Sequence, residues 1–138
     1  MRPVRGPGSG AFEVLLQLRA GWTHEGGCWG LPGGASDSGE DAVLTALREA
    51  GEELGVDPRK VRVLGNRTGT DHGDWRYVYV LGLVDADVHV EVLTAESDEA
   101  RWVDPRSGTA LLHPALARDW SGLAAEARRL LDRVRERP

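Results

Sequence analysis

Residues 34–56 read GASDSGEDAVLTALREAGEELGV, and this stretch decides the fold. Ser38 stands three residues before Asp41, in a pattern that is typical of a helix N-terminus. The apolar residues that follow recur at helical spacing: Val43, Ala46, Leu47, Ala50 and Leu54. We therefore predict a helix over residues 39–54, ended by Gly55, because glycine adopts the left-handed conformation of a C-cap at little cost.

The same helix carries an acidic stripe, formed by Glu49, Glu52 and Glu53. At ~100° per residue these side chains fall within an arc of ~100°, and the apolar positions centre on the opposite side. Like charges at i,i+4, as at Glu49 and Glu53, cost an isolated helix roughly 0.2–0.5 kcal/mol, so a ligand should offset the repulsion. Hard divalent cations take carboxylate oxygens as ligands. The stripe predicts a site for Mg²⁺ or Mn²⁺, and a solvated face of an amphipathic helix is the alternative.

The stretch also fits the longer pattern G-x5-E-x7-R-E-U-x-E-E-x-G-U, in which U is apolar, and it thereby resembles the Nudix box. Besides the acidic stripe, the residues that carry the fit are Gly34, Glu40, Arg48, Ala50, Gly55 and Val56. The resemblance is strongest over residues 29–56. It implies a Nudix-type α/β/α sandwich around a central mixed β-sheet, an α/β (α+β) fold, formed as one domain over residues 1–138.

The resemblance implies roles for the residues of this helix. The acidic stripe is expected to bind the metal and to carry catalysis, and Arg48 is expected to orient the glutamates. An ordinary surface ion pair between Arg48 and Glu52, at i,i+4, is the alternative for the arginine. Gly34, Glu40 and Gly55 are structural positions of the motif; helical geometry puts Glu40 away from the stripe, where negative charge supports the helix N-terminus.

Two loops are expected to add metal ligands. In the run Pro32-Gly33-Gly34, the resemblance implies that the carbonyl of Gly33 or Gly34 faces the metal, whereas an isolated Pro-Gly-Gly would be only a turn. The acidic loop before Trp102 is similar to one that often supplies a further carboxylate. We predict Glu96 for this position, with Glu99 as the second choice and an ordinary surface loop as the competing interpretation.

Substrate contacts are predicted on a strand and on neighbouring loops. Trp75, Tyr77 and Tyr79 alternate along a predicted strand and could offer a nucleobase a stacking surface, although aromatic strand positions are usually buried in the core. Arg19 and His72 are further candidates for substrate binding.

The rest of the chain alternates strands and loops before a final helix. Strand-like segments occupy residues 12–19, 61–70, 75–84, 88–93 and 100–103, with a short strand near Trp29, and the last helix is expected over residues 121–135. The N-terminal segment 1–11 offers few residues for the strand that family members commonly place before the one at Phe12. Either another chain completes that edge, which would make a homodimer, or the N-terminus has been trimmed.

Composition narrows the class of protein. Apolar residues make up 41% and charged residues 28%, as in a globular domain, and no run approaches the ~20 apolar residues of a membrane span. The net charge of -5 argues against a nucleic-acid polymer as partner, since phosphate-backbone affinity needs clustered Lys and Arg. Cys28 is the one cysteine and no secretory signal is seen, which favours the cytoplasm, and the excess of Arg over Lys favours a bacterial source.

These observations predict a metal-dependent hydrolase that cleaves the diphosphate linkage of a nucleoside diphosphate derivative, such as a nucleoside triphosphate, an oxidised nucleotide or an ADP-ribose-like compound. Glu53 is the residue that we expect to help deprotonate the attacking water. The alternative is a Nudix-fold sensor that binds such a compound without turnover. A purely structural protein would leave the acidic stripe without an explanation.

Overall fold

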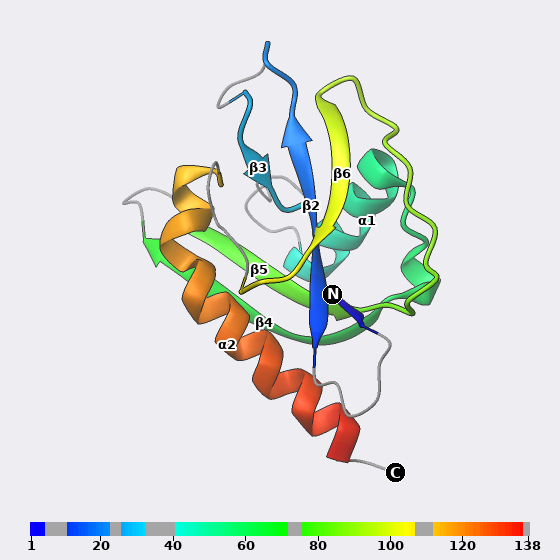
Figure 1. Ribbon diagram of the computed structural model, residues 1–138, viewed down its shortest axis with the longest axis vertical. Coiled ribbons are helices and arrows are strands. Elements are labelled where there is room, and N and C mark those ends of the chain that lie inside the picture. The colour runs from blue at the N-terminus through cyan, green and yellow to red at the C-terminus, as the bar shows by residue number, and fades with distance from the viewer. Residues whose placement is uncertain (5–10, 23–25, 33–40, 72–75, 107–111, 137–138) are drawn as a thin grey trace.

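The computed structural model describes residues 1–4, 11–22, 26–32, 41–71, 76–106 and 112–136, and it is an α/β/α sandwich, as the sequence predicts (Figure 1). Its elements in chain order are β1 (Arg2–Pro3), β2 (Phe12–Arg19), β3 (Trp29–Gly30), α1 (Ala42–Leu54), a 3-10 turn (Pro58–Lys60), β4 (Arg62–Asp71), β5 (Arg76–Leu83), β6 (Ser97–Val103) and α2 (Pro114–Glu136). Within these described residues, no helix is both long and apolar enough to cross a membrane.

Strand β2 is the centre of the larger sheet. It pairs antiparallel with β6 along most of its length, and with β3 through Gln17–Gly30 and Leu18–Trp29. Strands β4 and β5 form a second, two-stranded antiparallel sheet. Parallel pairing is represented in the described chain by the bridge between Trp29 and Leu112.

The N-terminal residues occupy the sheet edge beside Phe12. Strand β1 pairs with β2 through Arg2–Glu13 and Pro3–Phe12, and the amide of Val84 donates to the carbonyl of Met1 at 3.0 Å. Residues of the same chain therefore occupy this edge, which the sequence left either to another chain or to a trimmed N-terminus. The homodimer stays a prediction without that support.

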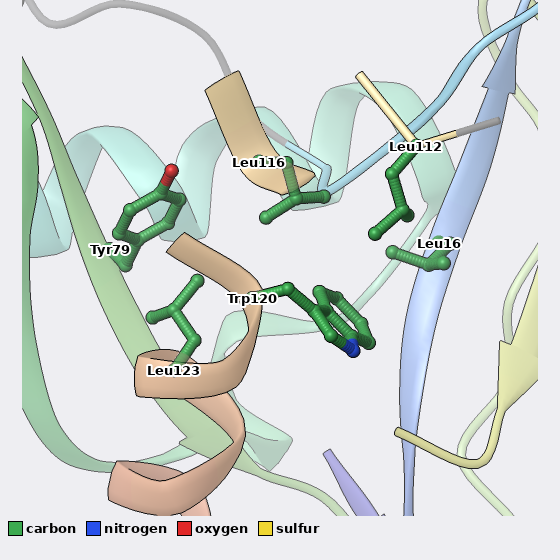
Figure 2. Close-up of a cluster of buried hydrophobic side chains, with 6 residues drawn as sticks. All are labelled: Leu16, Tyr79, Leu112, Leu116, Trp120 and Leu123. Atoms are coloured by element: carbon green, nitrogen blue, oxygen red, sulfur yellow. The ribbon is translucent and has the colours of Figure 1, made fainter. Parts of the chain in front are cut away.

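Each face of β2 packs against a different helix. On one face, Leu15 joins Leu54 and Val56 at the end of α1 in a buried cluster. On the other face, Leu16 packs with Tyr79 of β5 and with three residues of α2, and Figure 2 shows these α2 side chains lying between Leu16 and Tyr79. The α2 residues are Leu116, Trp120 and Leu123. Because both faces of the strand are covered, β2 has buried residues on each face.

Residues 88–93 and the start of α2 differ most from the sequence prediction. Residues 88–93 form no strand; instead, the amides of Glu91 and Leu93 donate to the carbonyls of Leu54 and Glu53, so this segment caps α1 rather than joining a sheet. Helix α2 begins at Pro114, seven residues before the predicted start, because proline fits the first turn and the ring Nδ1 of His113 accepts from the amide of Ala115.

Candidate active site

Helix α1 is fixed at both ends by its own sequence. Asp41 is the N-cap, and its carboxylate accepts from the amide of Val43 at 2.8 Å, which corrects the prediction of a start at residue 39. Gly55 is the C-cap, as predicted, with φ of 67° in the left-handed region. Its amide donates to the carbonyl of Gly51 at 3.0 Å. The length and phase of the helix therefore follow from Asp41 and Gly55.

The acidic stripe lies on α1, but it is less exposed than the helical geometry suggests. The side chain of Glu52 is 59% exposed and that of Glu49 only 23%, and Glu53 is half-buried. Arg48 contacts two of the three carboxylates, with its Nη1 3.5 Å from Glu49 Oε1 and 3.3 Å from Glu52 Oε2. The i,i+4 ion pair with Glu52, which was the alternative for Arg48, is therefore present, and Arg48 also contacts Glu49.

Glu53 turns toward the centre of the sandwich, where it meets a side chain of β2. The amide Nε2 of Gln17 lies 3.4 Å from Glu53 Oε2 and also 3.4 Å from the carbonyl of Leu31. On its other side, Gln17 Oε1 accepts from Ser97 Oγ at 2.8 Å. Gln17 is 4% exposed, so this buried amide connects α1, the segment before Pro32, and β6.

A cavity of about 440 Å³ lies between β2 and β5 and is bounded by both helices. Its size suits a small-molecule ligand. Arg19 and Tyr77, two of the predicted substrate-binding residues, line it, and so does Gln17. Gln17 therefore touches both the cavity and Glu53, whereas no carboxylate of the acidic stripe is among the described lining residues.

Tyr77 and Tyr79 both line the cavity, and both contact the core cluster around Trp120. Tyr79 is 9% exposed and belongs to the core cluster around Trp120. Its hydroxyl donates to Asp119 Oδ2 at 2.7 Å. Desolvation and the neighbouring Asp119 carboxylate raise the pKa of Tyr79 well above its usual range. Core packing is thus the correct interpretation for Tyr79. Tyr77 packs at the edge of the same cluster, and the ring centroids of Tyr77 and Tyr79 are 5.9 Å apart.

Of the two loops that were predicted to add metal ligands, the acidic loop before Trp102 lies in the described part of the chain. Glu96 is exposed in the turn before β6, and its carbonyl accepts from the amide of Ala20 at 2.9 Å. The remaining predictions fall outside the described residues and stay predictions: Gly33, Gly34, Glu40, His72 and Trp75.

The donor set of α1 fits a hard divalent cation. Three carboxylates outnumber the guanidinium of Arg48, and carboxylate oxygens are the ligands that Mg²⁺ and Mn²⁺ take. Among the described residues, no three acidic, histidine or cysteine side chains gather into a complete metal cluster. The predicted carbonyl ligand at Gly33 or Gly34 lies outside that part of the chain, so the metal site stays a prediction.

Sequence reasoning missed Gln17 and its partners. Along β2, Gln17 shares one face with Glu13 and Arg19, so the alternation by itself does not indicate that it is buried. The signal that could have corrected this is Leu15, an apolar residue on the same face, which indicates that this face is also covered. A glutamine beside a buried leucine in a central strand then has to find hydrogen-bond partners.

Comparison with known proteins assigns the family. Residues 4–124 match the NUDIX domain family, and the chain belongs to it. The chain is 40% identical over 121 residues to "Putative 8-oxo-dGTP diphosphatase 3" of Mycobacterium tuberculosis, covering 83% of this chain and 55% of that protein. It is 34% identical over 118 residues to the RNA pyrophosphohydrolase of Dinoroseobacter shibae, covering 71% of this chain and 72% of that protein.

The structural comparison agrees. The crystal structure of the Nudix hydrolase RenU from M. smegmatis aligns with a TM-score of 0.74 and 34% identity, over 89% of this chain and 79% of that chain. The chain spans about half the length of the M. tuberculosis relative. Family and fold are therefore established.

Proposed function

We propose that this chain is a metal-dependent hydrolase that cleaves the diphosphate linkage of a nucleoside diphosphate derivative. The observation that carries the proposal is the acidic stripe of α1, which stands in a complete Nudix box and is joined to the cavity through the contact between Gln17 and Glu53. The activities named for the M. tuberculosis and D. shibae relatives, a diphosphatase and a pyrophosphohydrolase, support the same bond as the target.

The acidic stripe is the proposed holder of Mg²⁺, with Mn²⁺ as a substitute. When bound, such a cation neutralises phosphate charge and makes a bound water more acidic. Glu49 and Glu52 already share Arg48, and the pair with Glu52 is exposed. Exposed ion pairs contribute only about 0–1 kcal/mol, so Glu52 can leave Arg48 for a cation at small cost.

Glu53 is the proposed base. Its carboxylate is half-buried, and the amide of Gln17 donates a hydrogen bond to its Oε2. In this role, the Glu53 carboxylate would take a proton from the attacking water, which is general-base catalysis. Arg19 and Tyr77, which line the cavity, are the proposed contacts for the nucleoside end of the substrate.

A Nudix-fold sensor is the second candidate function. It would bind the same nucleotide-like molecules and release them unchanged. The intact acidic stripe favours hydrolysis, because a sensor has no need for three adjacent carboxylates that repel one another.

A substrate screen tests the proposal directly. The purified chain is incubated with Mg²⁺ and with nucleoside triphosphates, oxidised nucleotides, nucleotide sugars and dinucleoside polyphosphates, and the products are separated by chromatography. We expect cleavage at a diphosphate linkage that stops when a chelator removes the metal. Binding without any product, measured by calorimetry on the same compounds, would instead identify a sensor.

The variant Glu53→Gln tests the role of the base. The new amide keeps an oxygen that can accept from Gln17, so we expect an unchanged melting temperature. Turnover should fall by at least ~100-fold, the low end of what positioned proton transfer contributes. Glu136→Gln, an exposed change at the end of α2, is the matched control and should keep full turnover. Full activity in the Glu53 variant would remove this residue from the mechanism.

A further inference from the structure

Gln17 is a polar residue at a buried position in the centre of the fold. It lies in the central strand β2, between two leucines, and is 4% exposed. A buried amide without hydrogen-bond partners destabilises a protein, so its partners indicate what the residue is for. Its backbone is also held on both edges of the strand, by pairing with Gly30 of β3 and Ala100 of β6.

The chemistry of the partners fixes the orientation of the amide group. Leu31 offers a carbonyl oxygen and Glu53 a carboxylate, and both are acceptors, so the NH₂ group of Gln17 has to face them. The oxygen of the amide then faces Ser97, whose hydroxyl donates to it at 2.8 Å and which is 8% exposed. The three contacts are mutually consistent and leave no other assignment.

The three contacts join three segments whose relative positions matter for the proposed mechanism. Leu31 immediately precedes the Pro32-Gly33-Gly34 run, Glu53 is the proposed base, and Ser97 begins β6. One NH₂ group, with one hydrogen for each acceptor, spans the backbone before that run and the carboxylate on α1. Both donor contacts are 3.4 Å long, which is longer than a usual N–H···O hydrogen bond, and catalytic hydrogen bonds often tighten only when ligand is bound.

We propose that Gln17 is a positioning residue, which sets the direction of the Glu53 carboxylate relative to the Leu31 carbonyl and is itself held by Ser97. The inference rests on the proposed function, because it concerns the residue assigned there as base. Gln17 acts through Glu53 and makes no contact with the reacting bond in this proposal. It should therefore influence turnover and metal binding more than substrate affinity.

The test compares Gln17→Met, which keeps the length of the side chain and removes the amide, with Ser97→Ala, which removes only the hydroxyl that holds it. Steady-state kinetics give kcat and KM, and the loss of the free Mn²⁺ signal in electron paramagnetic resonance gives the affinity for Mn²⁺ alone. We expect Gln17→Met to lower kcat or Mn²⁺ affinity about 10–100-fold, as is usual for residues that orient metal ligands, with KM nearly unchanged. Ser97→Ala should show a smaller loss of the same kind.

Leu130→Ala is the control for general loss of stability. Leu130 of α2 is buried in one cluster with Phe12 and Leu81 and belongs to no part of the site. It should lower the melting temperature and leave kcat and Mn²⁺ affinity unchanged at temperatures where the protein is folded. If Gln17→Met behaves like this control, Gln17 is only structural and the inference is wrong.

The remaining outcomes are also decisive. Should Gln17→Met fail to fold, a Ser97→Ala variant with wild-type kcat and Mn²⁺ affinity overturns the inference, and one with reduced values supports it. Should the wild-type chain hydrolyse no substrate, the proposed function fails, and Mn²⁺ affinity alone then decides the role of Gln17. An inactive Glu53→Gln beside a fully active Gln17→Met contradicts the inference and leaves the proposed function intact.

Discussion

Arg48 stands between two of the carboxylates that the proposed mechanism needs. Its guanidinium reaches both Glu49 and Glu52, and its side chain is 47% exposed. An ion pair so open to water stabilises the fold by at most about 1 kcal/mol. If Arg48 only stabilises the fold, its removal should change both the free energy of unfolding and the turnover very little. If it orients the glutamates, removal should affect catalysis selectively.

We predict that Arg48→Ala changes the free energy of unfolding by less than about 1 kcal/mol and lowers kcat about 10–100-fold. Urea denaturation and steady-state kinetics measure the two quantities. Arg129→Ala is a close match, since Arg129 is 49% exposed and pairs with Glu126 within the other helix. That variant should keep wild-type kcat. Equal activity of the two variants would reduce Arg48 to a surface ion pair.

Two glycines near the end of α1 make opposite demands on the backbone. Gly51 is inside the helix, and a Cβ added there would meet the carbonyl oxygen of Val56 at 3.4 Å, an ordinary contact. Gly55 has φ of 67°, and a Cβ there would lie 3.3 Å from Leu93 Cδ1. Alanine suits the first position and is strained at the second.

We therefore predict opposite signs for the same chemical change. Gly51→Ala should raise the free energy of unfolding by roughly 0.5–1 kcal/mol, because alanine favours the helix. Gly55→Ala should lower it by roughly 1–2 kcal/mol, because the left-handed conformation disfavours a side chain. Urea denaturation of both variants is the measurement, and each serves as the control for the other. A stability change of the same sign in both would contradict the conformational argument.

The elements that the sequence predicts well are those whose signals are local. The apolar period of helix α1 and its C-cap Gly55 are local in sequence, and only its start differs, at Ala42 instead of residue 39. Residues 88–93 show the opposite case, because their alternation is that of a strand and their backbone partners, the carbonyls of Glu53 and Leu54, are far away in sequence. The buried contacts of Gln17 are equally non-local, so the pattern of β2 alone could not reveal them.

At the scale of the molecule, α2 joins the two sheets. Its buried face contacts Leu16 and Phe12 of β2 and also Tyr79 and Leu81 of β5, which belong to different sheets. Figure 2 shows the part of this contact around Trp120.

A group of hydrogen bonds to Asp119, which we call the polar clamp, adds to this apolar contact. Asp119 of α2 accepts from the amide of Thr70 at 3.1 Å, from the Thr70 hydroxyl, and from the Tyr79 hydroxyl at 2.7 Å.

The clamp makes stability depend on pH in the alkaline range. Desolvation, followed by the hydrogen bond to Asp119, raises the pKa of Tyr79 in the folded chain. Below about pH 10 the phenol is protonated in both the folded and unfolded states, so its contribution to stability is fully present. Above about pH 10 the unfolded chain loses this proton and the folded chain retains it. Stability must then fall as pH rises, by at most about 1.4 kcal/mol per pH unit from this group.

Tyr79→Phe tests whether that loss comes from the clamp. Near pH 7 the variant should be less stable by about 1.5–3 kcal/mol, because a hydrogen bond to a charged carboxylate is lost. Above pH 10 its free energy of unfolding should fall less steeply than that of the wild type, and the two curves should converge. Thr70→Val is the control, because it weakens the same clamp but keeps the phenol, so it should be less stable at pH 7 with the wild-type slope retained. Parallel curves for wild type and Tyr79→Phe in urea denaturation between pH 9 and 11 would mean that Tyr79 ionises alike in both states, and α2 would then be held to β5 by its apolar contacts alone.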